Sequence, residues 1–103
     1  MRELIIFPEE LKSILNKVFL LDVRTEEEYK IVKINSSVLI PIHRLEDSIN
    51  ELPKDKEIVV YCHHGIRSAK AVEILRSKGF VNVKSLFGGI NKWSEIDKSV
   101  KKY

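Results

Sequence analysis

A single cysteine stands where a strand is expected to give way to a helix. Residues 57–61 read EIVVY, an apolar run typical of a covered strand, and Cys62 follows directly. A short loop comes next, and then a helix that begins near Arg67. Such a turn points backbone N–H groups and the positive end of a helix dipole into the loop, which favours a thiolate there. The segment therefore predicts a nucleophile that acts on small anions.

Four residues, His63, His64, Gly65 and Ile66, separate the cysteine from Arg67. Gly65 permits a positive φ or a close backbone approach. We expect the backbone N–H groups of residues 63–67 to surround an anion as a nest. Adjacent histidines chelate a metal poorly without further ligands, so we interpret His63 and His64 as loop walls that gain charge as the pH falls, and we expect no metal site.

Two residues at the start of the following helix have open roles. Arg67 and Ser68 either brace the loop or hold an anionic donor. For Arg67, a structural tie to an acidic residue and an anion-binding role are equally compatible with the sequence, and both can hold together.

Further polar residues are expected to support the same region. Asp22 and Arg24 follow an apolar run at 18–21 and are interpreted as an ion pair that braces the rim of the site. Thr25 and Glu28 have the spacing of a capping box. The other recognisable features have simple structural interpretations, with Gly88-Gly89 as a turn that could approach the cysteine loop and Trp93 as a core residue.

Composition narrows the class of protein. The 103 residues suit one domain over 1–103, and the net charge is +3 with acids and bases intermixed. No apolar run is long enough to span a membrane, and no signal peptide is recognisable, so a cytoplasmic location is expected. No basic stripe interleaved with aromatics indicates nucleic-acid binding. The basic tail, residues 98–103, is expected to be a solvent-exposed helix end.

Strands and helices are predicted to alternate along the chain. Short apolar runs predict strands, and apolar residues at helical spacing predict helices. Gly79 is expected to end the helix before it in the left-handed conformation. The predicted strands are 3–7, 18–21, 38–40, 57–61 and 83–87, and the predicted helices start at Pro8, follow Thr25, contain Leu45, Ile49 and Leu52, run over 67–78, and contain Ile90 and Trp93.

This alternation predicts an α/β protein with a parallel sheet and helices on both faces. Ligands of such sheets sit beyond the carboxyl ends of the strands. Cys62 follows the fourth predicted strand, Asp22 and Arg24 close the second, and Gly88 follows the fifth. These segments should therefore meet at one rim.

Several short motifs, taken in order, resemble those of the single-domain rhodanese-like sulfurtransferases, and the resemblance covers nearly the whole chain. It implies a three-layer α/β/α fold with a five-stranded parallel sheet flanked by helices. It also implies that sulfane sulfur moves from a donor such as thiosulfate to a nucleophilic acceptor through a persulfide of Cys62, by double displacement and without a cofactor. The motifs are Leu21-Asp22-Val23-Arg24 with Glu28-Tyr29, Ile40-Pro41, Val59-Val60-Tyr61-Cys62 with Gly65 and Arg67-Ser68, Gly79-Phe80, and Gly88-Gly89-Ile90 before Trp93.

The chain departs from the family pattern in two places. Residues 33–37 read KINSS where members usually carry His-Ile followed by Pro and Gly, and only Ile34 matches. His63 and His64 replace the basic pair of typical thiosulfate-using members, so the small sulfur donor is either thiosulfate or a persulfide. The HHG form resembles rhodanese domains associated with adenylyltransferases, which implies a sulfur-carrier protein or its activating enzyme as a partner.

Two other functions remain open at this point. A cysteine-dependent phosphatase or arsenate reductase shares the topology, but its loop places five residues between cysteine and arginine, whereas this loop has four. The tighter loop should fit one sulfur atom and exclude a tetrahedral phosphate. A non-catalytic rhodanese-like binding module usually lacks the cysteine, which this chain retains.

Overall fold

The computed structural model describes residues 4–103, and its centre is a sheet of five parallel strands. The strand order is β1-β5-β4-β2-β3, so β4 lies in the middle and pairs with β2 and β5. All four residues of β4 are buried, as expected for an apolar strand covered on both faces. The strands are β1 (Ile5–Ile6), β2 (Phe19–Asp22), β3 (Val38–Leu39), β4 (Ile58–Tyr61) and β5 (Val83–Leu86).

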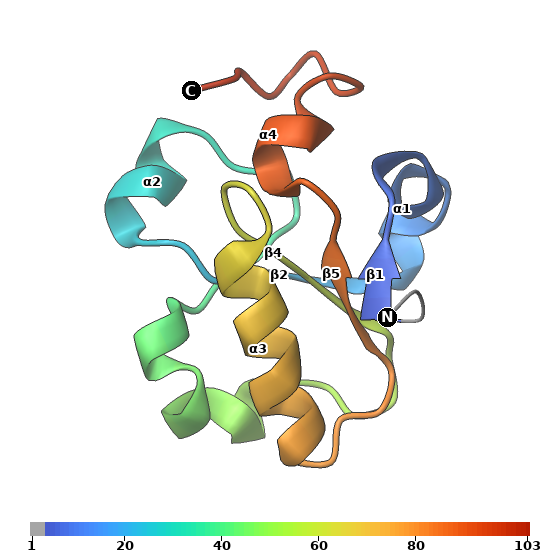
Figure 1. Ribbon diagram of the computed structural model, residues 1–103, viewed down its shortest axis with the longest axis vertical. Coiled ribbons are helices and arrows are strands. Elements are labelled where there is room, and N and C mark those ends of the chain that lie inside the picture. Colours follow the sequence, from blue (N-terminus) through green and yellow to red (C-terminus); the bar gives the residue numbers. More distant parts are fainter. Residues whose placement is uncertain (1–3) are drawn as a thin grey trace.

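Helices cover both faces of the sheet, which confirms the predicted three-layer α/β/α arrangement (Figure 1). On one face, Leu45, Val72 and Leu75 pack into a core cluster with residues of β2 and β4. On the other face, Leu11 and Trp93 are buried in a second cluster. The helices are α1 (Pro8–Ile14), α2 (Glu26–Ile31), α3 (Ile66–Ser77) and α4 (Gly89–Trp93), with 3-10 helices η2 (Leu15–Lys17), η3 (Ile42–Arg44) and η4 (Glu46–Glu51).

Local sequence signals fix several helix ends as predicted. Pro8 occupies the first position of α1. Thr25 caps α2: its hydroxyl accepts from the Glu28 N–H at 3.2 Å, and the Glu28 carboxylate accepts from the Thr25 N–H at 3.1 Å. Beyond α3, Gly79 has a φ of 96°, and the Phe80 N–H donates to the Leu75 carbonyl at 3.1 Å.

Three expectations differ from the structure. Residues 45–52 were predicted as an α-helix, but the segment forms the tighter 3-10 helix η4. The strand predicted over 3–7 is confirmed only at Ile5–Ile6, and Glu3 lies outside the described residues. The tail is not a helix end: α4 stops at Trp93, Val100 is buried, and the chain returns toward α2 (Figure 1).

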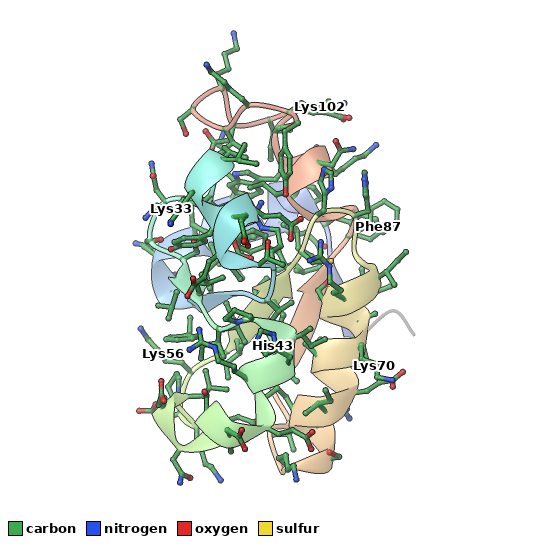
Figure 2. All side chains as sticks on the ribbon, turned by 90° about the vertical axis from the view of Figure 1, so that its left-hand side faces the viewer. Lys33, His43, Lys56, Lys70, Phe87 and Lys102 are labelled. Carbon is green, nitrogen blue, oxygen red and sulfur yellow. The ribbon has the colours of Figure 1, made fainter. Side chains whose placement is uncertain are left out.

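Lysine side chains are spread over the surface of the protein rather than gathered in one patch in the view of Figure 2. Lys33, Lys56, Lys70 and Lys102 lie far apart on the outline of the protein (Figure 2). No helix within residues 4–103 is long and apolar enough to cross a membrane.

Candidate active site

Cys62 lies immediately beyond β4, at the carboxyl end of the central strand, and is 1% exposed. Its Sγ accepts hydrogen bonds from the backbone N–H groups of Gly65 at 3.1 Å and Ser68 at 3.3 Å. Gly65 has a φ of 115° and directly precedes α3. The sulfur therefore rests on N–H groups at the amino end of a helix, an environment that stabilises negative charge.

The helix after β5 holds the loop from the other side. The N–H groups of Ile90 and Asn91 donate to the carbonyl oxygens of Cys62 and His63 at 2.8 and 3.0 Å. Only a glycine fits at Gly89, because a Cβ there would lie 2.5 Å from the Cys62 oxygen and 2.4 Å from the His63 oxygen. These two hydrogen bonds fasten the cysteine loop to the start of α4. The predicted approach of the glycine turn to the cysteine loop is confirmed.

Ser68 links the sulfur to a second hydroxyl. Its Oγ lies 3.5 Å from Cys62 Sγ, 3.2 Å from the Gly65 carbonyl oxygen and 2.7 Å from the Oγ of Ser85 on β5. Ser68 is fully buried, and Ser85 is nearly so. The nest was expected from residues 63–67, whereas the second N–H on the sulfur comes from Ser68, one position further along the chain.

Arg67 is tied to an acidic residue of α2. Its Nη1 and Nη2 donate to the two carboxylate oxygens of Glu28 at 2.7 and 3.0 Å, a bidentate pair. The Arg67 guanidinium is the main reason that the pKa of Glu28 falls to about 2, and the same pair raises the pKa of Arg67. Of the two roles considered for Arg67, the contacts show the bracing one.

Asp22 and Arg24 form the ion pair predicted at the end of β2. Arg24 Nη2 lies 2.7 Å from Asp22 Oδ2, and both side chains are fully buried. Burial alone would lower the pKa of Arg24, but the hydrogen bonds and charge of Asp22 outweigh it and raise that pKa. Arg24 also donates to the Val32 carbonyl at 2.6 Å, so the pair ties β2 to the segment after α2.

Tyr103 joins the two ion pairs. Its hydroxyl accepts from Arg24 Nη1 at 2.6 Å and donates to Glu28 at 3.1 Å. Its ring stacks on His63, with centroids 4.2 Å apart, and its carbonyl oxygen lies 3.2 Å from His63 Nε2. Burial, followed by the charge of His64, lowers the pKa of His63.

The remaining loop residues face outward. His64 is exposed and its ring lies 4.0 Å from that of His63, while Ile66 is 83% exposed at the first position of α3. A mainly apolar pocket of about 430 Å³ lies beside the loop, lined by His64 and Gly65 together with Phe87, which lies at the edge of the molecule (Figure 2). Within residues 4–103, no group of three or more histidine, cysteine or acidic side chains could hold a metal ion.

Sequence reasoning missed three contributors to this site. Glu28 was interpreted only as a capping acid, although it also holds Arg67. Ser85 stands in a strand where nothing in the sequence marks it. Tyr103 was included in a tail expected to be exposed. Their signals are pairings across the fold, which a single sequence does not display.

Comparisons with known proteins identify the family to which this fold belongs. A sulfurtransferase of Allochromatium vinosum is 36% identical over 77 residues, which cover 75% of this chain and 72% of that protein. A solved structure of a rhodanese-related protein from Thermoplasma volcanium is 36% identical, with a TM-score of 0.86, over 95% of this chain and 97% of that one. Residues 7–96 match the rhodanese-like domain. The chain therefore belongs to the rhodanese-like family.

A longer relative contains a similar segment. The probable adenylyltransferase/sulfurtransferase MoeZ of Mycobacterium tuberculosis is 37% identical over 95 residues. These cover 87% of this chain but only 24% of that protein, so the chain corresponds to about a quarter of it.

Proposed function

We propose that this protein is a sulfurtransferase that carries sulfane sulfur on Cys62. The observation that supports this most directly is the sulfur environment: Sγ accepts two backbone N–H groups at the amino end of α3. The relative named as a sulfurtransferase, similar over 72% of its length, supports the same class of reaction. We propose the cytoplasm as the compartment, where thiols stay reduced.

The proposed reaction is a double displacement. The Cys62 thiolate attacks the outer sulfur of thiosulfate, the sulfur–sulfur bond of the donor breaks, and sulfite leaves with the bonding electrons. Cys62 then carries a persulfide, whose terminal sulfur is anionic near neutral pH. An acceptor nucleophile attacks that terminal sulfur, and the Cys62 thiolate leaves and is restored. A persulfide donor serves equally, with a thiolate as the leaving group.

The loop residues have distinct proposed roles. The N–H groups of Gly65 and Ser68 stabilise the charge on the sulfur, as preorganised donors do in other active sites. Arg67 acts mainly by holding the loop to α2 through Glu28, and its positive charge favours an anionic donor. His63, His64 and Ile66 form the proposed wall that an acceptor approaches, because they belong to the loop after Cys62 and are partly or fully exposed.

The proposed acceptor is a protein. The similarity to the mycobacterial adenylyltransferase/sulfurtransferase supports a sulfur-carrier protein, or the enzyme that activates it, as the partner. The exposed Ile66 and the half-exposed Phe87 give the outer side of the loop region apolar surface for such a contact.

The intact mass after incubation with thiosulfate tests the proposal. We expect wild-type protein to gain one sulfur atom and to lose it again when cyanide is added, with formation of thiocyanate. Cys62→Ser should do neither while it retains the same circular dichroism spectrum and thermal midpoint. Ser37→Ala serves as a control, because it removes a hydroxyl bonded to Tyr61 rather than to the cysteine loop.

This experiment, together with a phosphatase assay, separates the two other functions. A binding module would gain no sulfur from either thiosulfate or a small-molecule persulfide. A phosphatase would hydrolyse a small aryl phosphate in a Cys62-dependent reaction. Wild-type-like sulfur transfer by Cys62→Ser would remove Cys62 from the mechanism.

A further inference from the structure

Two buried hydroxyl groups form a short chain that ends at the sulfur. Ser68 Oγ lies 3.5 Å from Cys62 Sγ and 2.7 Å from Ser85 Oγ. Their residues are 0% and 7% exposed. We propose that Ser85 is a positioning residue for Cys62: it donates to Ser68 and thereby directs the Ser68 proton to the sulfur when that sulfur is negatively charged.

The Ser68 hydroxyl has one proton to donate and three neighbours, namely the sulfur, the Gly65 carbonyl oxygen and the Ser85 hydroxyl. When Cys62 is a thiol, its S–H donates to Ser68 Oγ. When Cys62 is a thiolate, the sulfur only accepts, so a hydrogen bond between the two groups requires the Ser68 proton to turn toward the sulfur. Ser68 Oγ can then accept from Ser85, which is within hydrogen-bond distance.

The sheet holds Ser85 in place for this task. Ser85 lies on β5 and is in register with Val60 of β4, two residues before Cys62. A hydroxyl on a paired strand moves less than one on a loop, so its position relative to the cysteine is set by the sheet. Consecutive hydrogen bonds also polarise one another, so a donor to Ser68 makes the Ser68 hydroxyl a better donor to sulfur.

The charged groups around the loop also affect the balance between the thiol and the thiolate of Cys62. They must therefore stay unchanged when the role of Ser85 is tested. The pKa of Arg67 is raised first by its pair with Glu28 and to a lesser extent by the charge of Cys62. None of these groups hydrogen-bonds Ser85, whose hydroxyl can therefore be removed with the surrounding charges unchanged. The groups are Arg67 with Glu28 of α2, His63 and His64 of the loop, Asp22 and Arg24 at the end of β2, Glu73 of α3 at the pocket, and Tyr103 of the tail.

This inference rests on the proposed role of Cys62 as the nucleophile, and alkylation by iodoacetamide tests it without sulfur transfer. The thiolate displaces iodide from carbon, and the mass reports the thioether. In Ser85→Ala, the midpoint of the rate against pH should rise by about 0.5–1 pH unit, because the thiolate loses part of its support. Ser85→Thr keeps the hydroxyl and should stay near the wild-type midpoint, as should the Ser37→Ala control.

A double variant tests whether Ser85 affects the cysteine through Ser68 or independently of it. Ser68→Ala should raise the midpoint on its own, and adding Ser85→Ala to it should change nothing further, since the two residues act as one chain. If Ser85→Ala fails to fold, Ser85→Val, which matches the shape of Ser85→Thr without its hydroxyl, should show the raised midpoint.

An unchanged midpoint in Ser85→Ala, or a shift that adds fully to that of Ser68→Ala, would overturn the proposal. The two proposals fail separately. A protein that gains no sulfur from thiosulfate or from a persulfide, yet shows the Ser85-dependent midpoint, would refute the sulfurtransferase and leave the hydroxyl chain standing.

Discussion

The two arginines at the carboxyl edge of the sheet form ion pairs of opposite kinds. Arg24 and Asp22 are two residues apart in sequence, fully buried, and closed off from solvent. Arg67 and Glu28 are 39 residues apart, and their side chains are 35% and 18% exposed beside the cysteine loop. The first pair holds the end of one strand, whereas the second joins two helices at the place where the chemistry is proposed.

Two arginine–carboxylate pairs at the same edge of the sheet can therefore have different roles, one in stability and one in the proposed reaction. A fully buried pair contributes mainly by avoiding an unpaired charge, since removing one partner leaves the other desolvated. A half-exposed pair contributes little to stability, because water screens it. We therefore expect loss of Arg24 to weaken the fold and loss of Arg67 to weaken the proposed reaction.

The largest effect is expected from Arg24→Met. The buried carboxylate of Asp22 would lose its partner, and the free energy of unfolding should fall by about 3–5 kcal/mol in urea denaturation. Combining Arg24→Met with Asp22→Asn removes the unpaired charge and should recover part of that loss. A fall of under about 1 kcal/mol, the range of an exposed pair, would abolish the distinction between the two pairs.

Arg67→Ala should show the opposite profile. Sulfur transfer to cyanide should fall by about one to two orders of magnitude, corresponding to loss of a charge-assisted contact of about 1.5–3 kcal/mol, while stability changes little. Arg67→Lys should fall nearly as far, because lysine cannot form the bidentate contact to Glu28. If Arg67→Lys retained most of the activity, the charge of Arg67 rather than its bracing contact would explain its role. Unchanged activity in Arg67→Ala would exclude Arg67 from the mechanism.

The contribution of the half-exposed pair, Arg67 and Glu28, to stability should depend on pH within a defined range. The pKa of Glu28 lies at about 2 in the folded protein against an ordinary value of 4.5, so its contribution to stability is complete above pH 4.5 and is lost as the pH falls toward 2. Urea unfolding of wild type and Glu28→Gln should differ most above pH 4.5 and converge below it. A constant difference across that range would show that the charge of Glu28 contributes nothing.

The smallest effect is expected from Tyr103→Phe, which retains the stack on His63 and removes the hydroxyl between the two pairs. Stability should fall by about 0.5–1.5 kcal/mol in thermal or urea unfolding. Tyr29→Phe is the matched control, since that hydroxyl donates to the Ser37 carbonyl at 2.8 Å, away from both pairs. Only Tyr103→Phe should also slow sulfur transfer; equal rates in the two variants would separate Tyr103 from the loop.

Local signals in the sequence were sufficient for most of the architecture. The capping box of Thr25 and Glu28 was predictable because its two hydrogen bonds join residues three apart. The order of strands and helices followed from apolar runs, and the position of Cys62 at a strand end followed from that order. The Asp22–Arg24 pair was also predictable, since its partners are neighbours in sequence.

Other features depend on contacts that the sequence does not display. Leu45, Ile49 and Leu52 fit the spacing of an α-helix, but Asp47, Ser48 and Asn50 between them have low helix propensity, and the segment adopts 3-10 turns. The tail was expected in solvent because it is basic. Its last residue instead packs on His63, 40 residues earlier in the chain.

The contacts between α4 and the cysteine loop have a consequence for the newly made chain. Synthesis delivers β4 and Cys62 well before Ile90 and Asn91, whose N–H groups hold the carbonyls of Cys62 and His63. A nascent chain on the ribosome therefore has the thiol without the partners that shape its loop. The proposed reactive loop is complete only when α4 has docked, so we expect the reactivity of the cysteine to report that the C-terminal part of the protein has folded.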